Sequence, residues 1–308
     1  MHDVIIIGAG PAGLVAGLYC GRFRLNTLII EKMSVGGQIV LSPTIENFPG
    51  FPSGIATDEL IGKIKKQVDE VGVPVVTEDV LGITVSGGTG IPVYGIKTAG
   101  NAYEARAVIV ASGAYSKRLG VAGEERFIGR GVSYCGTCDA PFFRNKEIAI
   151  VGGGDRAVEE AIFLTSYASK VTLIHRRQEL RASSILVEKA KQNPKINFKL
   201  DSVIEEISGK DKVEALKIKN VVSSAVEDFS CQGVFIFVGI KPNTDFVKNL
   251  LRLDEAGFII TDQDMKASAD AVFACGDCRK KGLYQVVNAC GEAAAAADSA
   301  HKYLLNLK

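Results

Sequence analysis

Short apolar runs of strand length alternate along the chain with segments whose apolar residues recur at helical spacing. The strand-length runs are Val4–Ile7, Leu28–Ile30, Val108–Ala111, Ile148–Val151, Val171–Ile174, Val234–Ile240 and Ala271–Ala274. Helices are predicted from about Ala12 to Arg22 and from Asp58 to Val71, and Thr57 could cap the second helix. This alternation predicts an α/β protein with parallel sheets.

One internal repeat organises the chain. Val4–Gly13 resembles Ile148–Ala157, because both read as a strand, a glycine-rich turn and a helix. The repeat predicts two Rossmann-like, three-layer nucleotide-binding units. The stretch Arg118–Arg130, rich in glycine and charge, is interpreted as a linker between them, and a second crossing is predicted near Lys241–Thr244.

Composition narrows the class of protein. The 308 residues suit two domains better than one core, and 36 basic against 35 acidic residues argue against a nucleic-acid surface. No apolar run approaches the ~18 residues of a membrane span, and the first strand begins too early for a signal peptide. Seven cysteines without a secretory signal indicate intracellular thiols, so we expect a cytoplasmic protein.

The glycine turn after the first strand has the residues of a dinucleotide site. Gly8 allows a tight turn, Gly10 lets the backbone approach a pyrophosphate, and Gly13 permits close packing of helix on sheet. Glu31, at the end of the next strand, can accept hydrogen bonds from ribose hydroxyls, which fits FAD or NAD. The alternative is a glycine turn that only packs.

The second glycine turn indicates a different ligand. Gly152, Gly154 and Ala157 keep the small-residue spacing, but no acid ends the next strand. A basic cluster stands there instead, consisting of His175, Arg176, Arg177 and Arg181. Clustered guanidinium groups fit the 2′-phosphate of NADPH, unless they form only a solvated strand end. At the helix entry, Asp155 could cap the helix and Arg156 could touch the pyrophosphate.

Two later strands each end in a small-residue turn, which favours a flavin in the first site. The turns are Ser112-Gly113, after Val108–Ala111, and Cys275-Gly276-Asp277, after Ala271–Ala274. Asp277 can bond the ribityl chain of FAD. The alanine-rich helix after Gln285 could direct its positive end to the flavin as it gains negative charge on reduction.

A pair of cysteines supplies candidate redox chemistry. Cys135 and Cys138 form a CxxC motif at a helix start, which can bring two sulfurs within disulfide reach and lower a thiol pKa. Asp139 follows and could exchange protons with the dithiol, cap the next helix, or do both. Zinc is the alternative, because Cys275 and Cys278 form a second CxxC. That pair overlaps the flavin turn and is interpreted as packing, as are the remaining cysteines, Cys20, Cys231 and Cys290.

Together these motifs resemble the low-molecular-weight thioredoxin reductases, class II of the pyridine nucleotide-disulfide oxidoreductases, along essentially the whole chain. The motifs are Gly8–Gly13, Gly36-Gly37-Gln38, Glu46–Gly50, Cys135–Asp139, Gly152–Glu160, His175–Arg181 and Gly276-Asp277. The dithiol combined with the arginine cluster separates this family from related ferredoxin–NADP reductases, which share the fold but lack the dithiol.

The resemblance implies a discontinuous FAD domain, residues 1–115 and 245–308, and an inserted NADPH domain, residues 116–244, that carries the CxxC. NADPH would reduce FAD, FAD would reduce the disulfide, and the dithiol would reduce thioredoxin through a mixed disulfide. Cys138 would face the flavin, Cys135 would attack thioredoxin, and Asp139 would serve as the acid. A homodimer is also implied, with domain rotation about hinges near 114–118 and 241–245.

The family pattern also assigns binding residues. The expected FAD contacts are Gly8, Gly10, Pro11, Ala12, Gly13, Glu31, Lys32, Gly37, Gln38, Asn47, Ala111, Ser112, Gly113, Gly276, Asp277, Gln285, Val286 and Val287. The expected NADPH contacts are Gly152, Gly154, Asp155, Arg156, Ala157, His175, Arg176, Arg177 and Arg181, and no metal is expected. Arg130, Phe142 and Phe143 match positions used near thioredoxin, although both phenylalanines could instead pack inside the domain.

Some residues depart from the family pattern. Gly136 stands where alanine is commoner, and Tyr284 stands where arginine is frequent. These departures could alter the choice of partner or of nicotinamide nucleotide, but they do not threaten the class. Three other functions stay open: reduction of another small redoxin such as a glutaredoxin-like protein, a flavin dithiol oxidase, and a non-enzymatic redox sensor or FAD-binding module. The arginine cluster argues against the oxidase, and two complete nucleotide sites would have no use in a sensor.

Overall fold

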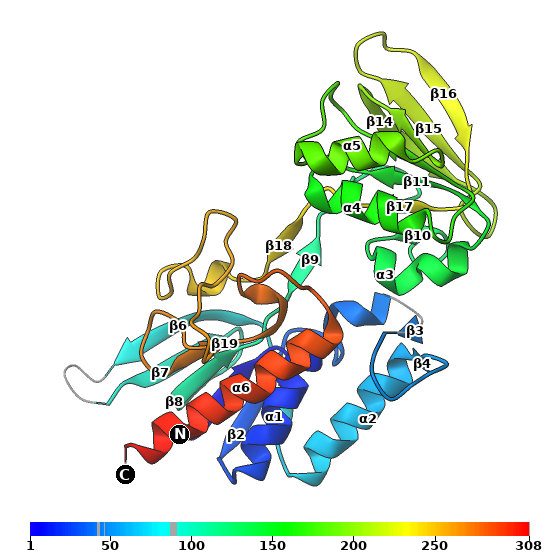
Figure 1. Ribbon diagram of the computed structural model, residues 1–308. Coiled ribbons are helices and arrows are strands. Elements are labelled where there is room, and N and C mark those ends of the chain that lie inside the picture. Colours follow the sequence, from blue (N-terminus) through cyan, green and yellow to red (C-terminus); the bar gives the residue numbers. More distant parts are fainter. Residues whose placement is uncertain (42–43, 46, 87–90, 308) are drawn as a thin grey trace. The chain divides into compact units, whose positions relative to one another are not determined.

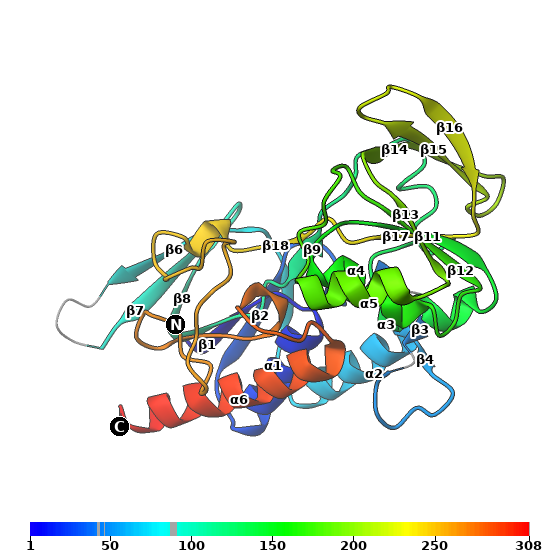
Figure 2. The same cartoon turned by 45° about the horizontal axis from the view of Figure 1, so that its top comes forward.

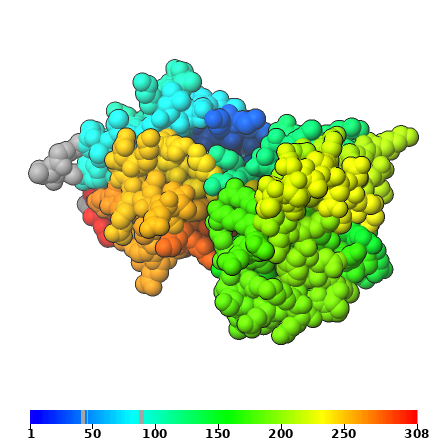
Figure 3. Space-filling view, turned by 90° about the horizontal axis from the view of Figure 1, so that it is seen from above, coloured from blue at the N-terminus to red at the C-terminus, as the bar shows by residue number. Residues whose placement is uncertain are grey.

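A computed structural model describes residues 1–41, 44–45, 47–86 and 91–307. The chain divides into two compact units, Met1–Tyr115 with Lys241–Lys308, and Ser116–Ile240. Each unit has its own sheets and helices (Figure 1), and the second unit forms one continuous green-to-yellow body in Figure 3. The predicted α/β class with parallel sheets is confirmed.

The first unit is built on a seven-stranded sheet in the order β5-β2-β1-β8-β7-β6, with β19 paired to β8. The strands are β1 (His2–Ile7), β2 (Thr27–Glu31), β5 (Val75–Thr77), β6 (Val80–Ser86), β7 (Val93–Thr98), β8 (Ala102–Val110) and β19 (Val272–Ala274). Its central strands are parallel, and Val4–Ile7 of β1 and Ala107–Val110 of β8 are buried, which explains why these parts of the two strands are unbroken apolar runs.

Three helices belong to the first unit: α1 (Pro11–Arg22), α2 (Thr57–Glu70) and α6 (Val286–Leu305). α1 packs against both α6 and α2, and Figure 2 shows α6 running beside α1. Ala56 occupies the N-cap of α2, so Thr57 is its first residue and the predicted Thr57 cap is wrong. The shorter elements are η1 (Gly37–Leu41), β3 (Thr44–Ile45), β4 (Ile55–Ala56), η3 (Asp245–Val247) and η4 (Gly276–Cys278).

The second unit has three layers around a parallel sheet in the order β10-β17-β11-β12-β13. Its strands are β10 (Val132–Ser133), β11 (Glu147–Val151), β12 (Lys170–Ile174), β13 (Ile196–Lys199) and β17 (Val234–Ile236). One layer contains α3 (Gly136–Asp139), η2 (Ala140–Phe143), α4 (Asp155–Leu164) and α5 (Ser184–Gln192). The other is an antiparallel sheet of β14 (Ser202–Ser208), β15 (Ala215–Asn220) and β16 (Val226–Ser230).

Alternate residues of β11 serve the two layers of this unit. Ile148 and Ile150 belong to the apolar cluster that includes α4, whereas Ala149 and Val151 belong to the cluster that includes β14 and β15. A strand that packs on both faces in this way needs apolar residues at every position. The sheet therefore holds the ends of β11 and β12, and the turns that follow them, in fixed places.

The chain crosses between the units twice, at β9 (Ala114–Ser116) and β18 (Ile240–Pro242), which pair with each other. The predicted run Val234–Ile240 is not one strand: β17 ends at Ile236, and Gly239, with a φ of 120°, precedes β18. The two compact units meet at 240/241, and Asn243 N–H donates to Gly113 O at 2.9 Å within the first unit.

The stretch Arg118–Arg130 is not a linker but part of the second unit, so that interpretation is wrong. Glu124, only 1% exposed, organises it by accepting hydrogen bonds from the backbone N–H groups of Leu119 and Gly120. The Tyr134 hydroxyl also donates to Glu124, at 2.7 Å. Among the residues that the structure describes, no helix has the length and apolar character needed to cross a membrane.

Candidate active site

The expected FAD residues of the first glycine turn gather around the N-terminus of α1. Gly8 has a φ of 107°, and a Cβ on it would lie 2.4 Å from Ala111 O. A Cβ on Gly13 would lie 1.7 Å from Gly8 O, so α1 can approach β1 this closely only with glycine there. Glu31 Oε2 accepts a hydrogen bond from Ala9 N–H at 2.6 Å, which holds the carboxylate beside the turn.

The start of η1 lies against the same turn. Gly37 has a φ of 63°, and a Cβ on it would lie 3.2 Å from Gly10 Cα. Gln38 follows and is exposed. Lys32 is also exposed and forms an ion pair with Asp79 at 3.0 Å. The family motif Glu46–Gly50 includes the expected contact Asn47. The first residue of this motif, Glu46, lies outside the residues that the structure describes.

The residues after two further strands also lie beside the Gly8–Gly13 turn. Ser112 follows β8 and lies beside Gly8, the first glycine of the turn. A Cβ added to Gly8 would lie 3.2 Å from Ser112 Cα. Gly276 follows β19 with a φ of 74°, and a Cβ on it would lie 2.9 Å from Ala12 Cβ on α1. Asp277 comes next and forms an ion pair with Lys281 at 2.8 Å. Residues far apart in the sequence thus surround the N-terminus of α1.

A buried ionic network fixes the Gly276 turn to α6. The Glu292 carboxylate, 7% exposed, accepts hydrogen bonds from Gly276 N–H at 2.8 Å, Arg279 Nη1 at 2.7 Å and Asn288 Nδ2 at 3.0 Å. Lys281 Nζ lies 3.4 Å away, with its side chain 4% exposed. This network was not expected from the sequence, where Glu292 is one polar position in an alanine-rich helix.

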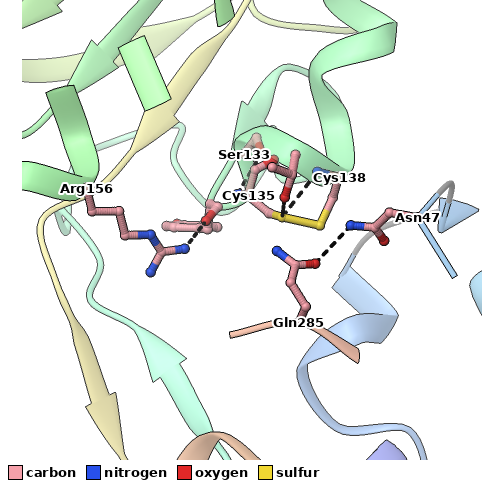
Figure 4. Close-up of a disulfide and its surroundings, with 8 residues drawn as sticks. Asn47, Ser133, Cys135, Cys138, Arg156 and Gln285 are labelled. Carbon is pink, nitrogen blue, oxygen red and sulfur yellow. Dashed lines mark hydrogen bonds between the residues drawn. A yellow bond between two sulfur atoms is a disulfide. The ribbon is translucent and has the colours of Figure 1, made fainter. Parts of the chain in front are cut away.

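Within the described residues, neither α1 nor α6 has a side-chain cap at its start. The N-caps are Gly10, which has no side chain, and Gln285. Gln285 Oε1 accepts a hydrogen bond from Asn47 Nδ2 at 2.9 Å (Figure 4), and Val286 and Val287 form the first turn of α6. Uncapped helix starts favour anionic ligands, which fits a pyrophosphate at α1 and a reduced flavin ring at α6.

The second glycine turn is packed as tightly as the first. A Cβ on Gly152 would lie 2.6 Å from Ala157 Cβ, and a Cβ on Gly153 would lie 2.3 Å from Cε1 of His175. His175 is buried beneath the turn, and this burial, with the charge of Arg181 next in importance, lowers its pKa from 6.5. The imidazole is therefore neutral near pH 7 and supports the turn through packing.

The three arginines of the cluster are exposed beside this turn. Within the described part of the chain, no carboxylate forms a salt bridge with Arg176, Arg177 or Arg181. Arg181 N–H donates to Gly153 O at 2.6 Å, which ties the cluster to the glycine turn. Gly154 occupies the N-cap of α4 without a side-chain cap. This arrangement suits a phosphate at the helix start and a second phosphate at the arginines.

The predicted role of Asp155 as the cap of α4 is wrong. Asp155 is the first residue of that helix, and its carboxylate instead accepts a hydrogen bond from the backbone N–H of Ser183, the N-cap of α5, at 2.7 Å. Arg156 lies with its guanidinium 5.3 Å from the centre of the Phe237 ring and donates to Tyr134 O at 3.5 Å. Arg156 thus connects the glycine turn to the segment before the CxxC motif.

Cys135 and Cys138 are joined in a disulfide with their Cα atoms 5.3 Å apart (Figure 4). Cys135 is the N-cap of α3, and its Sγ accepts a hydrogen bond from Cys138 N–H at 3.2 Å. Ser133 Oγ accepts from Cys135 N–H at 3.1 Å and so orders the approach to the helix. Cys135 Sγ therefore lies at the N-terminal end of α3, where a thiolate is stabilised.

Two carboxyl groups lie beside this disulfide. Asp139 is the last residue of α3 and precedes η2, and its Oδ1 is buried. Glu160 comes from α4 and packs its carboxyl group against Gly136, a contact that the sequence analysis missed. The signal was available, because Glu160 falls at helical spacing among the buried residues Ala157, Ala161 and Leu164.

Of the other cysteines, Cys20, Cys231, Cys275 and Cys278 are buried as expected, whereas Cys290 is partly exposed. Cys275 and Cys278 are fully buried free thiols, and burial raises the pKa of Cys278 to about 11. Burial likewise raises the pKa of Cys20 and Cys231 to about 12 and that of Cys290 to about 11. The described residues contain no group of three or more side chains arranged to hold a metal ion.

The aromatic pair expected at a thioredoxin surface divides into two environments. Phe142 is 43% exposed, whereas Phe143 is 7% exposed and packs edge-on against Phe235 with ring centres 4.9 Å apart. The prediction of an exposed pair is therefore wrong for Phe143, which belongs to the core. Arg130 is exposed.

Comparisons with known proteins agree with these features. A model of the pyridine nucleotide-disulphide oxidoreductase family matches residues 2–293. Curated thioredoxin reductases are similar over the full chain, at 44% identity for Peptoclostridium litorale and 41% for Bacillus subtilis, covering 98% and 96% of those proteins. A crystal structure of thioredoxin reductase from Streptococcus pyogenes has 44% identity and a TM-score of 0.93, with 99% of each chain covered. The resemblance found in the sequence is confirmed, and the chain belongs to the thioredoxin reductases within the pyridine nucleotide-disulphide oxidoreductase family.

Proposed function

We propose that this protein is an NADPH-dependent FAD enzyme that reduces thioredoxin through the Cys135–Cys138 disulfide. The observation that carries the proposal is this disulfide at the start of α3, in the same unit as a glycine turn flanked by exposed arginines. The second unit therefore contains both a redox pair and a candidate nucleotide site. Substrate and cofactor identity are supported by the relatives, which are named thioredoxin reductases.

The residues present fit the two cofactors. The uncapped start of α1, the Gly8–Gly13 turn and Glu31 suit an FAD without a 2′-phosphate, and the exposed arginines suit NADPH. When bound, FAD supplies the route by which the two electrons of NADPH reach the disulfide. Lys32 and Gln38 are also proposed to contact FAD, and the only structural support for this is that both side chains are exposed.

The geometry of α3 supports different tasks for the two sulfurs. Because Cys138 N–H donates to Cys135 Sγ, a negative charge on Cys135 is stabilised once the disulfide is reduced. Cys135 is therefore proposed as the thiolate that attacks the disulfide of thioredoxin, and Cys138 as the thiol that later releases it. Asp139 is proposed to exchange protons with the pair, since its carboxyl group follows Cys138 directly and is partly buried.

The test is an NADPH-coupled turnover assay against thioredoxin, with a glutaredoxin-like protein, NADH and oxygen as comparison substrates. Cys135→Ser and Cys138→Ser should each abolish thioredoxin reduction while the flavin stays bound and is still reduced by NADPH. Cys290→Ser, which changes a thiol outside the pair, should retain turnover. Full turnover in either variant of the pair would refute the proposal. Light scattering of the same preparations would test the proposed homodimer.

A further inference from the structure

The side chain of Glu160 fills space beside the CxxC motif that a side chain on Gly136 would need. A Cβ placed on Gly136 would lie 1.8 Å from Glu160 Oε2 and 2.8 Å from its Cδ. Gly136 is the first residue of α3, directly after Cys135, and α3 packs against α4. The carboxyl group of Glu160 is thus in contact with the backbone that the disulfide closes into a ring.

The environment of this carboxyl group favours its neutral form. Glu160 Oε2 is buried and has no hydrogen-bond partner among the residues that the structure describes. A buried carboxylate without a donor loses solvation that nothing replaces. Burial therefore raises the pKa of Glu160.

Few charges act on Glu160. On its own helix, Arg156 lowers its pKa and the exposed Glu159 raises it, both less than burial does. α3 brings Asp139, with Oδ1 buried. α5 also packs against α4 and carries three charged residues, none of which is among the charges that shift this pKa: Glu188, Lys189 and Lys191.

We propose that Glu160 is a positioning residue of the redox centre whose proton is coupled to the charge of the Cys135–Cys138 pair. The inference rests on the proposed function, because it requires this pair to be redox-active. Reduction breaks the Sγ–Sγ bond and adds two electrons, with one proton when one sulfur stays a thiolate and two when both become thiols. A thiolate and an ionised Glu160 would repel each other across α3.

The repulsion gives a defined pH dependence. At low pH, Glu160 is neutral in both redox states and does not affect the equilibrium. Above its pKa, the ionised carboxylate destabilises a reduced pair that holds a thiolate, so the disulfide becomes harder to reduce. By reciprocity, reduction raises the pKa of Glu160 further and holds a proton on it.

The experiment compares the midpoint potential of the disulfide in the full-length protein and in Glu160→Gln, which has nearly the same shape but no charge. Dithiothreitol redox buffers set the potential, and thiol trapping followed by mass analysis of the 135–138 peptide reads the reduced fraction, from about pH 5 to about pH 9. Neither NADPH nor thioredoxin is needed. Glu188→Gln removes the same charge from an exposed position on α5 and serves as the control.

The two potentials should coincide at the acidic end and separate as the pH rises. At the alkaline end the unmodified protein should be the more negative by about 30 mV, which corresponds to a tenfold change in the equilibrium constant. Glu188→Gln should follow the unmodified protein throughout. Equal potentials for Glu160→Gln and the unmodified protein at every pH would overturn the coupling. A pair that dithiothreitol cannot reduce and reoxidise would instead overturn the proposed function.

A second measurement tests the packing on which the coupling depends. Gly136→Ala should lower the thermal midpoint when Glu160 is present, because the new Cβ meets its carboxyl group. The same change should lower the midpoint less in a Glu160→Ala background, where the space is open. An equal effect in both backgrounds would show that the carboxyl group does not fill this space, and the inference would fail.

Discussion

Removal of the Glu292 carboxylate should destabilise the first unit strongly. In Glu292→Ala, the buried cation of Arg279 loses its carboxylate at 2.7 Å and Gly276 N–H loses its acceptor. Lys281 loses the carboxylate at 3.4 Å but keeps its ion pair with Asp277. Breaking a buried ion pair by removing one partner costs about 3–5 kcal/mol. For a unit of this size each kcal/mol lowers the thermal midpoint by about 2–4 °C, so we expect a loss of roughly 6–20 °C.

Thermal unfolding followed by circular dichroism provides the assay, with flavin content after gel filtration as the second readout. Asp298→Ala is the matched control, because it removes an exposed carboxylate from the same helix, where it pairs with Lys302 at 2.7 Å. An exposed pair of this kind contributes about 0–1 kcal/mol, so the control should lose at most a few degrees. Glu292→Gln keeps an acceptor for Gly276 and should fall between the two. If Glu292→Ala and Asp298→Ala lose the same few degrees, the network does not hold the turn and the reasoning is refuted.

Four other variants test separate parts of the protein. Arg176→Ala combined with Arg177→Ala should raise the KM for NADPH far more than that for NADH in steady-state assays, with a loss of about 1–3 kcal/mol for charge-assisted bonds; equal effects on both nucleotides would contradict the arginine assignment. Gly13→Ala places a Cβ 1.7 Å from a backbone oxygen and should yield protein without bound flavin, as absorbance would record. Phe142→Ala should raise the KM for thioredoxin with little change in thermal midpoint. Phe143→Ala should instead lose about 3–5 kcal/mol of stability, because that ring is in the core.

The sequence was sufficient for the fold class because the features that determine it are local. Glycines at fixed spacing after an apolar strand, as at Gly8 and Gly152, indicate a tight strand-to-helix turn, and both turns require glycine because neighbouring backbone or side chains approach closely. The CxxC pair was equally readable, since two cysteines separated by two residues at the start of a helix lie within disulfide reach.

The sequence was insufficient where burial decides the role of a polar residue. Glu124 was assigned to a linker because glycine and charge surround it, yet it is a buried acceptor for backbone and tyrosine donors. Glu160 and Glu292 are ordinary helix residues by composition, and only the tertiary packing of α4 on α3 and of α6 on η4 gives them partners or removes water from them. Phe142 and Phe143 are identical in type and adjacent, so composition could not assign one to solvent and the other to the core.

The pairing of β9 with β18 also bears on the order in which the chain folds during synthesis. In the first unit, β8 ends at Val110 and its neighbour β19 begins at Val272, so that contact forms only after the whole second unit has been translated. The second unit is one continuous segment and is free to fold first, as early-translated domains do. Once it has folded, the β9–β18 pairing holds its two ends together, and the loop that β8 and β19 must close becomes short. We therefore expect nascent chains stalled before β19 to contain a protease-resistant second unit and an incomplete first unit.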